Sequence, residues 1–186
     1  SKFPPRNPAE LIADLHAQVA ANQLGISEIE QLVADVGQEE VNMYMHHLQS
    51  NASAAVQNLL KGLESTNFSV ELDNGAKLHV DIIVDNVNYQ AKLDFSQTSS
   101  QGWGNFQAPL AITKSAVLYV FRCLLTDDIP LNSGCFKPLE LIVPKGSLLN
   151  PIPPAAVVAG NVETSQALCN LLFGALGVLS ASQGTM

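Results

Sequence analysis

Polar residues crowd one junction of this chain, where an apolar run meets the start of an apolar helix. Residues 155–159 are all alanine or valine, and Gly160 follows them. The polar residues at the junction are Asn161, Glu163, Thr164, Ser165 and Gln166. The pattern predicts a buried strand, a tight turn and a helix start. Unpaired backbone N–H groups and short polar side chains meet at such a place, so binding or catalytic groups often sit there.

The residue types at this junction restrict its chemistry. Glu163 would repel a phosphate, so the junction suits a cation, a metal-bound water or an amide-bearing ligand better. A purely structural interpretation is also available, because Asn161 is a good helix N-cap and Glu163 suits the positive end of the helix dipole. Spacing alone favours the two interpretations about equally.

A second polar stretch is the loop at residues 94–105, which follows an expected strand. Its amide side chains include Gln101 and Asn105, and Gly102 and Gly104 flank Trp103. Such a loop can offer several hydrogen-bond donors to a ligand. Polar loops are common, however, and their Ser and Thr residues often bond their own backbone, so composition alone favours an ordinary solvated loop.

Other chemical signatures are weak or absent. His46 and His47 are adjacent on an expected helix and point in different directions, so they cannot chelate one ion together. His16 and His79 have no carboxylate or cysteine at ligand spacing. We therefore assign no metal ligands in this chain. The sequence has no HExxH, CxxC or GxSxG, and no GxxxxGK[ST], which excludes ATP binding through a P-loop.

Composition limits the classes of protein to which the chain can belong. Its 186 residues are 47% hydrophobic with a net charge of −8, so the chain can build a core and carries no basic face for nucleic acid. Its three cysteines are scattered, which fits a reducing, cytoplasmic compartment. The longest apolar runs are broken by Arg122 and Asn170 and are shorter than the roughly 20 residues of a membrane span.

The first third of the chain is predicted to be helical. Asn7, Pro8 and Glu10 form a capping signature, and a helix with an apolar stripe should run to Gly25. Ser27 and Glu30 repeat the signature for a second helix with a buried face that ends at Gly37. A long helix is expected over residues 39–60.

The hydrophobic period then changes to two. Residues 68–72, 78–84 and 89–95 alternate and are separated by short polar gaps, which predicts an antiparallel meander. A helix should begin at Pro109 and run to about residue 125, and a short strand should occupy residues 139–143. The predicted class is α+β, with a helical section over residues 1–64 and a sheet-and-helix section over residues 65–186.

Several motifs, in order along nearly the whole chain, resemble the hydantoinase B/5-oxoprolinase family. The matching stretches are residues 14–22 (DLHAQVAAN), 94–105 (DFSQTSSQGWGN), 128–134 (DIPLNSG), 144–151 (PKGSLLNP), 154–157 (PAAV), 160–166 (GNVETSQ) and 181–186 (ASQGTM). Departures occur at Ala13 and Gln97, where the family prefers Gly, and at Gln107, where it prefers Asn. They affect the expected geometry of the loop.

The resemblance implies a fragment of the B-type part of an ATP-dependent cyclic-amide hydrolase similar to 5-oxoprolinase, which converts 5-oxo-L-proline to L-glutamate. In the family, phosphorylation belongs to a hydantoinase A-like partner and ring opening to the B-type part. We expect Glu163 to act as general base. The residues expected to hold the lactam are Asn161, Thr164 and Gln166, with Asn105, Gln101 and Gln183 as second choices.

The resemblance also limits what this segment should do alone. The family's metal-binding region lies upstream of the first residue, and the chain stops within its last motif. We therefore expect a middle segment of a larger subunit that is inactive by itself and holds no cofactor, with ATP and a divalent metal used by the intact enzyme. The alternatives are an N-methylhydantoinase-like or acetone carboxylase-like subunit, and a non-catalytic scaffold that binds the A-type partner.

Overall fold

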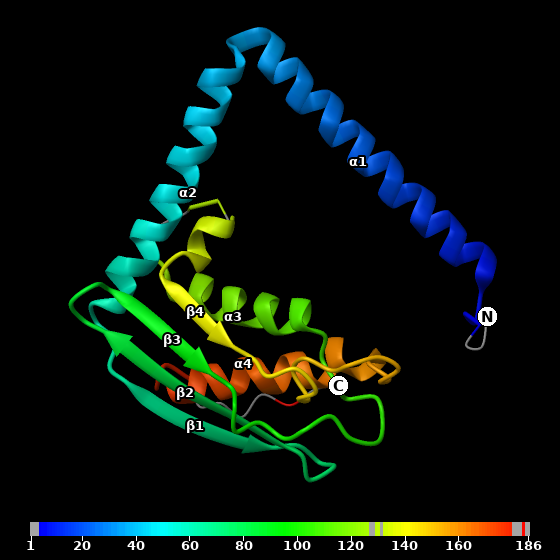
Figure 1. The fold of residues 1–186 in the computed structure, drawn as a ribbon, viewed down its shortest axis with the longest axis vertical. Coiled ribbons are helices and arrows are strands. Elements are labelled where there is room, and N and C mark those ends of the chain that lie inside the picture. Colours follow the sequence, from blue (N-terminus) through cyan, green and yellow to red (C-terminus); the bar gives the residue numbers. More distant parts are fainter. Residues whose placement is uncertain (1–3, 127–128, 131, 180–183, 185–186) are drawn as a thin grey trace. The chain divides into compact units, whose positions relative to one another are not determined.

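A computed structural model describes residues 4–126, 129–130, 132–179 and 184. Contacts divide the chain into two compact units between His47 and Leu48. The first unit contains helix α1 (Pro8–Val36) and the first turns of α2 (Gln38–Leu60), and the second contains the rest of α2 and all of the later elements (Figure 1). Each unit is described by itself.

Helix α1 begins as its capping residues predict. The Asn7 side chain accepts a hydrogen bond from the Glu10 backbone N–H at 3.3 Å and donates to the Glu10 carboxylate at 3.0 Å. The predicted stop at Gly25 is wrong, because α1 continues through it to Val36. The Ser27 hydroxyl bonds the Gln23 carbonyl inside this helix instead of capping a new one. The helix ends at Gly37, whose φ of 93° is favourable only for glycine.

The predicted buried faces of this first helical stretch are also wrong. No residue of α1 is buried in the part of the chain that the structure describes. Helix α2 agrees with its predicted bounds within one residue, and its later turns place Ala52, Val56 and Leu60 in the core of the second unit.

The sheet of the second unit has four strands in the order β1-β2-β3-β4. Strands β1 (Thr66–Glu71), β2 (Lys77–Asp85) and β3 (Gln90–Asp94) form the predicted antiparallel meander. Strand β4 (Leu139–Ile142) lies parallel to β3, with Leu93 opposite Leu141. The parallel pairing follows from the long connection through α3 (Leu110–Leu124), since parallel strands need a crossover.

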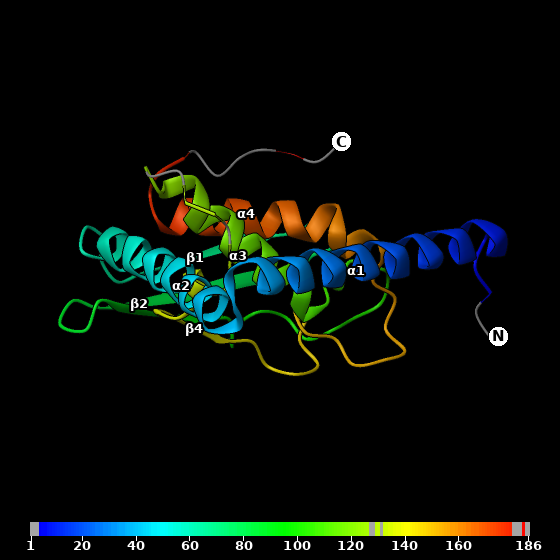
Figure 2. The ribbon, with the colours of Figure 1, turned by 90° about the horizontal axis from the view of Figure 1, so that it is seen from above.

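Two helices cover one face of this sheet. Helix α4 (Glu163–Ala175) contacts β1 and β2 and packs along α3, as Figure 2 shows. The core between these layers includes Leu93, Phe95, Phe121 and Leu172, each almost fully buried. The arrangement of sheet and packed helices confirms the predicted α+β class.

The predicted strand at residues 155–159 does not form. Short 3₁₀ helices occupy Ser133–Phe136 (η1) and Val158–Asn161 (η2), and η2 leads directly into α4. Val157 and Val158 are exposed, so this apolar run has no sheet to join. A short run of apolar residues cannot by itself distinguish a buried strand from other structures.

Candidate functional site

The start of α4 is built by backbone and hydroxyl contacts. Val162, and not Asn161, occupies the N-cap position, and it makes no side-chain capping bond. The predicted capping role of Asn161 is therefore wrong by one residue. Its backbone carbonyl instead accepts a hydrogen bond from the Ser165 hydroxyl at 2.7 Å. The exposed Asn161 side chain is consequently not needed to cap the helix.

Thr164 joins α4 to the polar loop that follows β3. Its side chain is fully buried, and its hydroxyl donates to the backbone carbonyl of Phe106. The hydrogen bond is partly buried, and a carbonyl that lost its donor there would be left without a partner at a cost in free energy, so the contact fixes the helix start against the loop. The structure therefore gives Thr164 a positioning contact within the protein.

A close backbone approach holds the same two segments together. A Cβ atom on Gly160 would lie 2.1 Å from the Gln107 carbonyl oxygen, so only glycine fits there. Beside it, the Ala159 N–H donates to the Asn105 carbonyl at 2.9 Å. The buried Gln107 amide donates to the carbonyls of Gly104 and Ala156, each at 3.0 Å. The loop and the junction thus form one rigid arrangement, although 49 residues separate Gln107 from Ala156.

Gln101 hydrogen-bonds the polar loop at residues 94–105 to the segment around Ile152. Its side-chain oxygen accepts from the Ile152 N–H at 2.6 Å, and its side-chain nitrogen donates to the Ile152 carbonyl at 3.3 Å. Both polar atoms of this amide are hydrogen-bonded to the Ile152 backbone, which is typical of a side chain with a structural role. A substrate would have to displace these bonds to use Gln101.

A cavity of about 270 Å³ lies between α3 and α4 and brings two of the predicted site residues together. Asn161 and Gln166 line it from one side. The other lining residues are Ile112, Ser115, Ala116, Tyr119, Ser165 and Cys169. Amide and hydroxyl groups thus face a partly apolar wall, which is the usual make-up of a small-molecule site.

The ionisable groups in this cavity favour their neutral forms. Burial, and to a lesser extent Cys123, raises the pKa of the Cys169 thiol to about 11. A hydrogen bond with Cys123 is the main cause that raises the pKa of Tyr119. At neutral pH the thiol and the phenol are therefore protonated. A cavity lined by neutral donors and acceptors suits a neutral polar ligand, such as an amide, better than an ion.

The remaining predicted residues are not brought into this cavity. Glu163 is half-buried at the first position of α4 and is not among the residues that line the cavity. Asn105 is half-buried in the loop, and Gln183 lies outside the described residues. Their proposed roles stay predictions.

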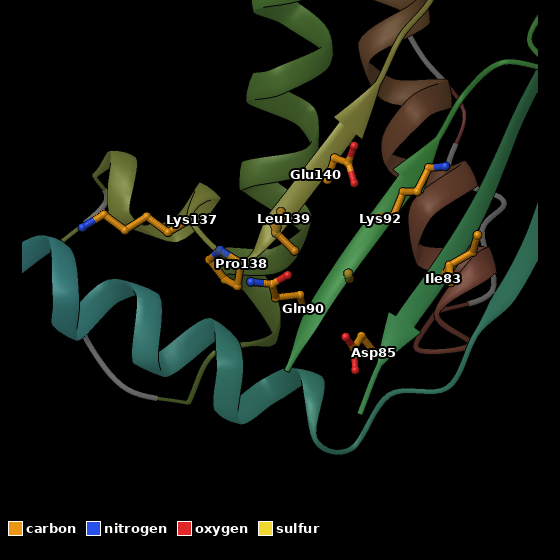
Figure 3. Close-up of a pocket in the computed structure, with 9 residues that line it drawn as sticks. Ile83, Asp85, Gln90, Lys92, Lys137, Pro138, Leu139 and Glu140 are labelled. Carbon is orange, nitrogen blue, oxygen red and sulfur yellow. The ribbon is translucent and has the colours of Figure 1, made fainter. Parts of the chain in front are cut away.

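A larger cavity, of about 480 Å³, opens beside β3 and β4. Figure 3 shows that the charged ends of Lys92, Lys137 and Glu140 point apart around it. Lys92 is engaged with Asp94 at 3.5 Å, and Asp85 accepts hydrogen bonds from Val87 and Asn88. Because these groups do not converge, we prefer the cavity between α3 and α4.

His79 has partners that its sequence context did not reveal. Its Nδ1 lies 2.7 Å from the Ser69 hydroxyl on the neighbouring strand, and its Nε2 lies 3.2 Å from an Asp81 carboxylate oxygen. Nε2 makes no hydrogen bond of acceptable geometry, although the Asp81 carboxylate lies next to it. Residues two apart on a strand point to the same face of the sheet, so the strand predicted over residues 78–84 could have indicated that His79 and Asp81 lie side by side.

No group of three or more His, Cys, Asp or Glu residues is placed to hold a metal ion within the described ranges. The donor set in this part of the chain therefore does not fit a divalent metal. None of the described helices is both long and apolar enough to cross a membrane.

Comparison with known proteins gives concordant results. The family model described as hydantoinase B/oxoprolinase matches residues 2–186. The chain is 40% identical to 5-oxoprolinase 1 of Arabidopsis thaliana, over 94% of this chain and 15% of the relative. It is 44% identical to 5-oxoprolinase of Saccharomyces cerevisiae, over 93% of this chain and 14% of the relative. The chain thus spans about one seventh of the length of these relatives.

A solved structure shares the fold. The ATP-dependent caprolactamase from Pseudomonas jessenii superimposes with a TM-score of 0.68 and 20% sequence identity, over 91% of this chain and 31% of that one. At this identity the likeness concerns the fold alone. It shows that the arrangement of sheet and helices described above occurs in other proteins.

Proposed function

The chain belongs to the hydantoinase B/oxoprolinase family, and from that membership we propose that it is part of an ATP-dependent cyclic-amide hydrolase that opens 5-oxo-L-proline to L-glutamate. The similarity to relatives named 5-oxoprolinase over nearly all of these residues is the observation that carries the proposal. The segment would contribute one wall of the active site, and by itself it would be inactive.

The cavity between α3 and α4 supports an amide ligand. Its neutral lining matches a lactam, which carries one N–H donor and one carbonyl acceptor. Asn161 and Gln166 each offer a donor and an acceptor, so either can pair with both lactam atoms. In this proposal Asn161 and Gln166 orient the ring, and Thr164 holds the start of α4 in place through Phe106.

Glu163 is the carboxylate that we propose as general base. A carboxylate near the substrate can take a proton from the attacking water, provided that the water lies within hydrogen-bond reach. Glu163 sits at the start of α4, within three residues of Gln166. Gln101, Asn105 and Gln183 remain secondary candidates for substrate contacts.

The nucleotide chemistry would come from a hydantoinase A-like part, fused or separate. The sequence contains no P-loop, and the described residues do not fit a divalent metal. ATP would supply a phosphoryl group that activates the lactam. The residues here would hold the ring itself, whereas the A-like part would bind the phosphoryl group, which neither Glu163 nor the neutral cavity favours. The cysteines Cys123, Cys135 and Cys169 are free thiols, which supports a cytoplasmic setting.

The Glu163→Gln variant of the full-length enzyme tests the assignment. Ring opening, measured as glutamate formed from 5-oxoproline, should be lost, because the amide cannot accept the proton. Glu140→Gln is the matched control, since Glu140 is an exposed carboxylate on β4 and its loss should leave turnover unchanged. Unchanged turnover in Glu163→Gln would refute the role of Glu163.

The same assay separates the alternatives. An N-methylhydantoinase-like or acetone carboxylase-like subunit would turn over those substrates and not 5-oxoproline. A non-catalytic scaffold would keep ring opening in both carboxylate variants, and changes at the junction would weaken binding of the A-type partner instead.

A further inference from the structure

The middle of helix α1 carries no charged residue of the Asp, Glu, Lys or Arg type on any side. This uncharged stretch covers residues 15–27 and is about 20 Å long at the helical rise. The acidic residues of α1 lie before and after it, and they are Glu10, Asp14, Glu28, Glu30 and Asp35. A helix on the surface of a globular protein carries charged residues on its solvent side, so the uncharged stretch does not have the sequence of a surface helix.

One side of α1 changes its character where the uncharged stretch ends. Successive residues are about 100° apart around a helix, so Glu28 and Asp35 lie on the same side as Leu24. Beyond residue 27 this side is therefore charged, as expected for contact with water. Within the uncharged stretch the same side consists of Leu24 and three alanines, Ala17, Ala20 and Ala21. The sequence thus indicates that this side is solvated at the end of α1 and covered in its middle.

The opposite side of the uncharged stretch is apolar as well. It carries Leu15, Val19 and Ile26, and Val19 lies about 140° around the helix from Leu24. Val19 is 54% exposed and Leu24 is 63% exposed, and no residue of α1 is buried in the part of the chain that the structure describes. One packed helix covers a single stripe of α1 and would leave the other side in water. Covering both sides therefore takes at least two neighbouring segments.

The amide side chains of the uncharged stretch show what kind of surroundings it needs. Gln18, Asn22 and Gln23 lie between its two apolar sides. A buried amide is costly unless it finds a hydrogen-bond partner, and lipid hydrocarbon offers none. The uncharged stretch is also shorter than the roughly 20 residues that span a membrane. The surroundings that fit it are the interior of a protein, with polar groups placed opposite the amides.

We propose that residues 15–27 are enclosed on all sides by segments of the same polypeptide that lie outside residues 1–186. The family model matches from residue 2 onward, so α1 belongs to the hydantoinase B/oxoprolinase region itself. The chain spans 15% of the Arabidopsis relative and 14% of the yeast relative. A polypeptide of that length has ample chain to supply the several segments that the enclosure requires. The inference rests on family membership and is independent of the proposed reaction.

Cysteine labelling in the full-length polypeptide tests the enclosure. Val19→Cys and Leu24→Cys place thiols on opposite sides of the uncharged stretch, and Gln31→Cys is the control on the side of Leu24 where that side is charged. The rate of reaction with a maleimide is compared with the rate for the same variant in urea, and the unsubstituted protein serves as the blank. We expect the thiols at 19 and 24 to react at least about a hundredfold more slowly than in urea, because reaction requires local opening, and the thiol at 31 to react within about tenfold. A Leu24→Cys rate equal to that of Gln31→Cys, or protection that is lost when a dimer dissociates on dilution, would overturn the proposal.

Photo-leucine identifies the covering segments without substituting any residue by another type. This leucine analogue forms covalent bonds with neighbouring atoms on illumination, and it would replace Leu15 and Leu24 in the full-length polypeptide. Gel electrophoresis separates cross-links within one copy from those that join two copies, and mass spectrometry maps the linked peptides. We expect both positions to be linked, within one copy, to peptides outside residues 1–186. Links that join two copies, that lead only to residues 48–186, or that form only after a separate hydantoinase A-like subunit is added would overturn the proposal.

Discussion

Replacing Gly160 with alanine should destabilise the second unit strongly, although it adds a single methyl group. The new Cβ would lie 2.1 Å from the Gln107 carbonyl oxygen and 2.8 Å from the Ala108 Cα, while ordinary van der Waals contact begins at 3.4 Å. Both neighbours are backbone atoms and cannot rotate away. The two segments must therefore separate by more than 1 Å.

The magnitude follows from overpacking and from the bond that the separation breaks. Inserting a methyl group into a filled site costs roughly 1–3 kcal/mol, and the Ala159–Asn105 hydrogen bond of 2.9 Å is worth about 1 kcal/mol. We expect a loss of about 3 kcal/mol in the free energy of unfolding. With a urea dependence of about 2 kcal/mol per molar, the midpoint should fall by about 1.5 M.

Gly102→Ala is the control for this measurement. Gly102 lies in the same loop, has nothing within 4 Å of the corresponding Cβ position and has no left-handed backbone. Its replacement should change stability by less than about 0.5 kcal/mol. Urea unfolding followed by circular dichroism compares both variants with the parent chain. A Gly160→Ala midpoint within error of that of Gly102→Ala would refute the close-packing argument.

Two further predictions concern α4. Thr164→Val should lower the free energy of unfolding, measured in urea, by about 1–3 kcal/mol, because the Phe106 carbonyl would lose its buried donor. Thr164→Ser keeps the hydroxyl and should retain most of the parent stability. Equal stability of the parent and both variants would contradict the contact. The thiol of Cys169 should resist iodoacetamide at pH 8, because its pKa, raised to about 11, leaves on the order of a hundredfold less thiolate than an ordinary cysteine has. Mass spectrometry should show that alkylation of Cys169 rises only as the pH approaches 11, and fast labelling at pH 8 would contradict the raised pKa. The stability that the neutral thiol contributes should be fully present below the ordinary cysteine pKa and should be lost as the pH rises through 11.

Local signals predicted much of the fold. The Asn7 cap, the meander of β1 to β3 and the bounds of α2 follow from capping chemistry and from hydrophobic periods of two and 3.6. The stop at Gly25 was wrong because a single glycine costs only about 1 kcal/mol within a helix, and the neighbouring turns outweigh it.

The candidate site was less predictable, because its geometry depends on contacts between distant segments. The composition of residues 155–159 could not reveal that they lie outside the sheet, and capping preference placed the start of α4 one residue early. The pairing of Gly160 with Gln107, and of Gln101 with Ile152, joins segments about 50 residues apart. Periodicity carries no information about such pairs. His79 and Asp81 are different, since the alternation of a strand places them on one face.

The parallel β4 strand also protects the chain from aggregation. It is only four residues long, yet it covers the edge of β3, whose N–H and C=O groups would otherwise face solvent. A shorter version of this protein that ends before Leu139 would leave Gln90–Asp94 as an open edge, ready to pair with a strand of another molecule. Any attempt to isolate the meander should therefore retain α3 and β4, even though the meander is continuous in sequence.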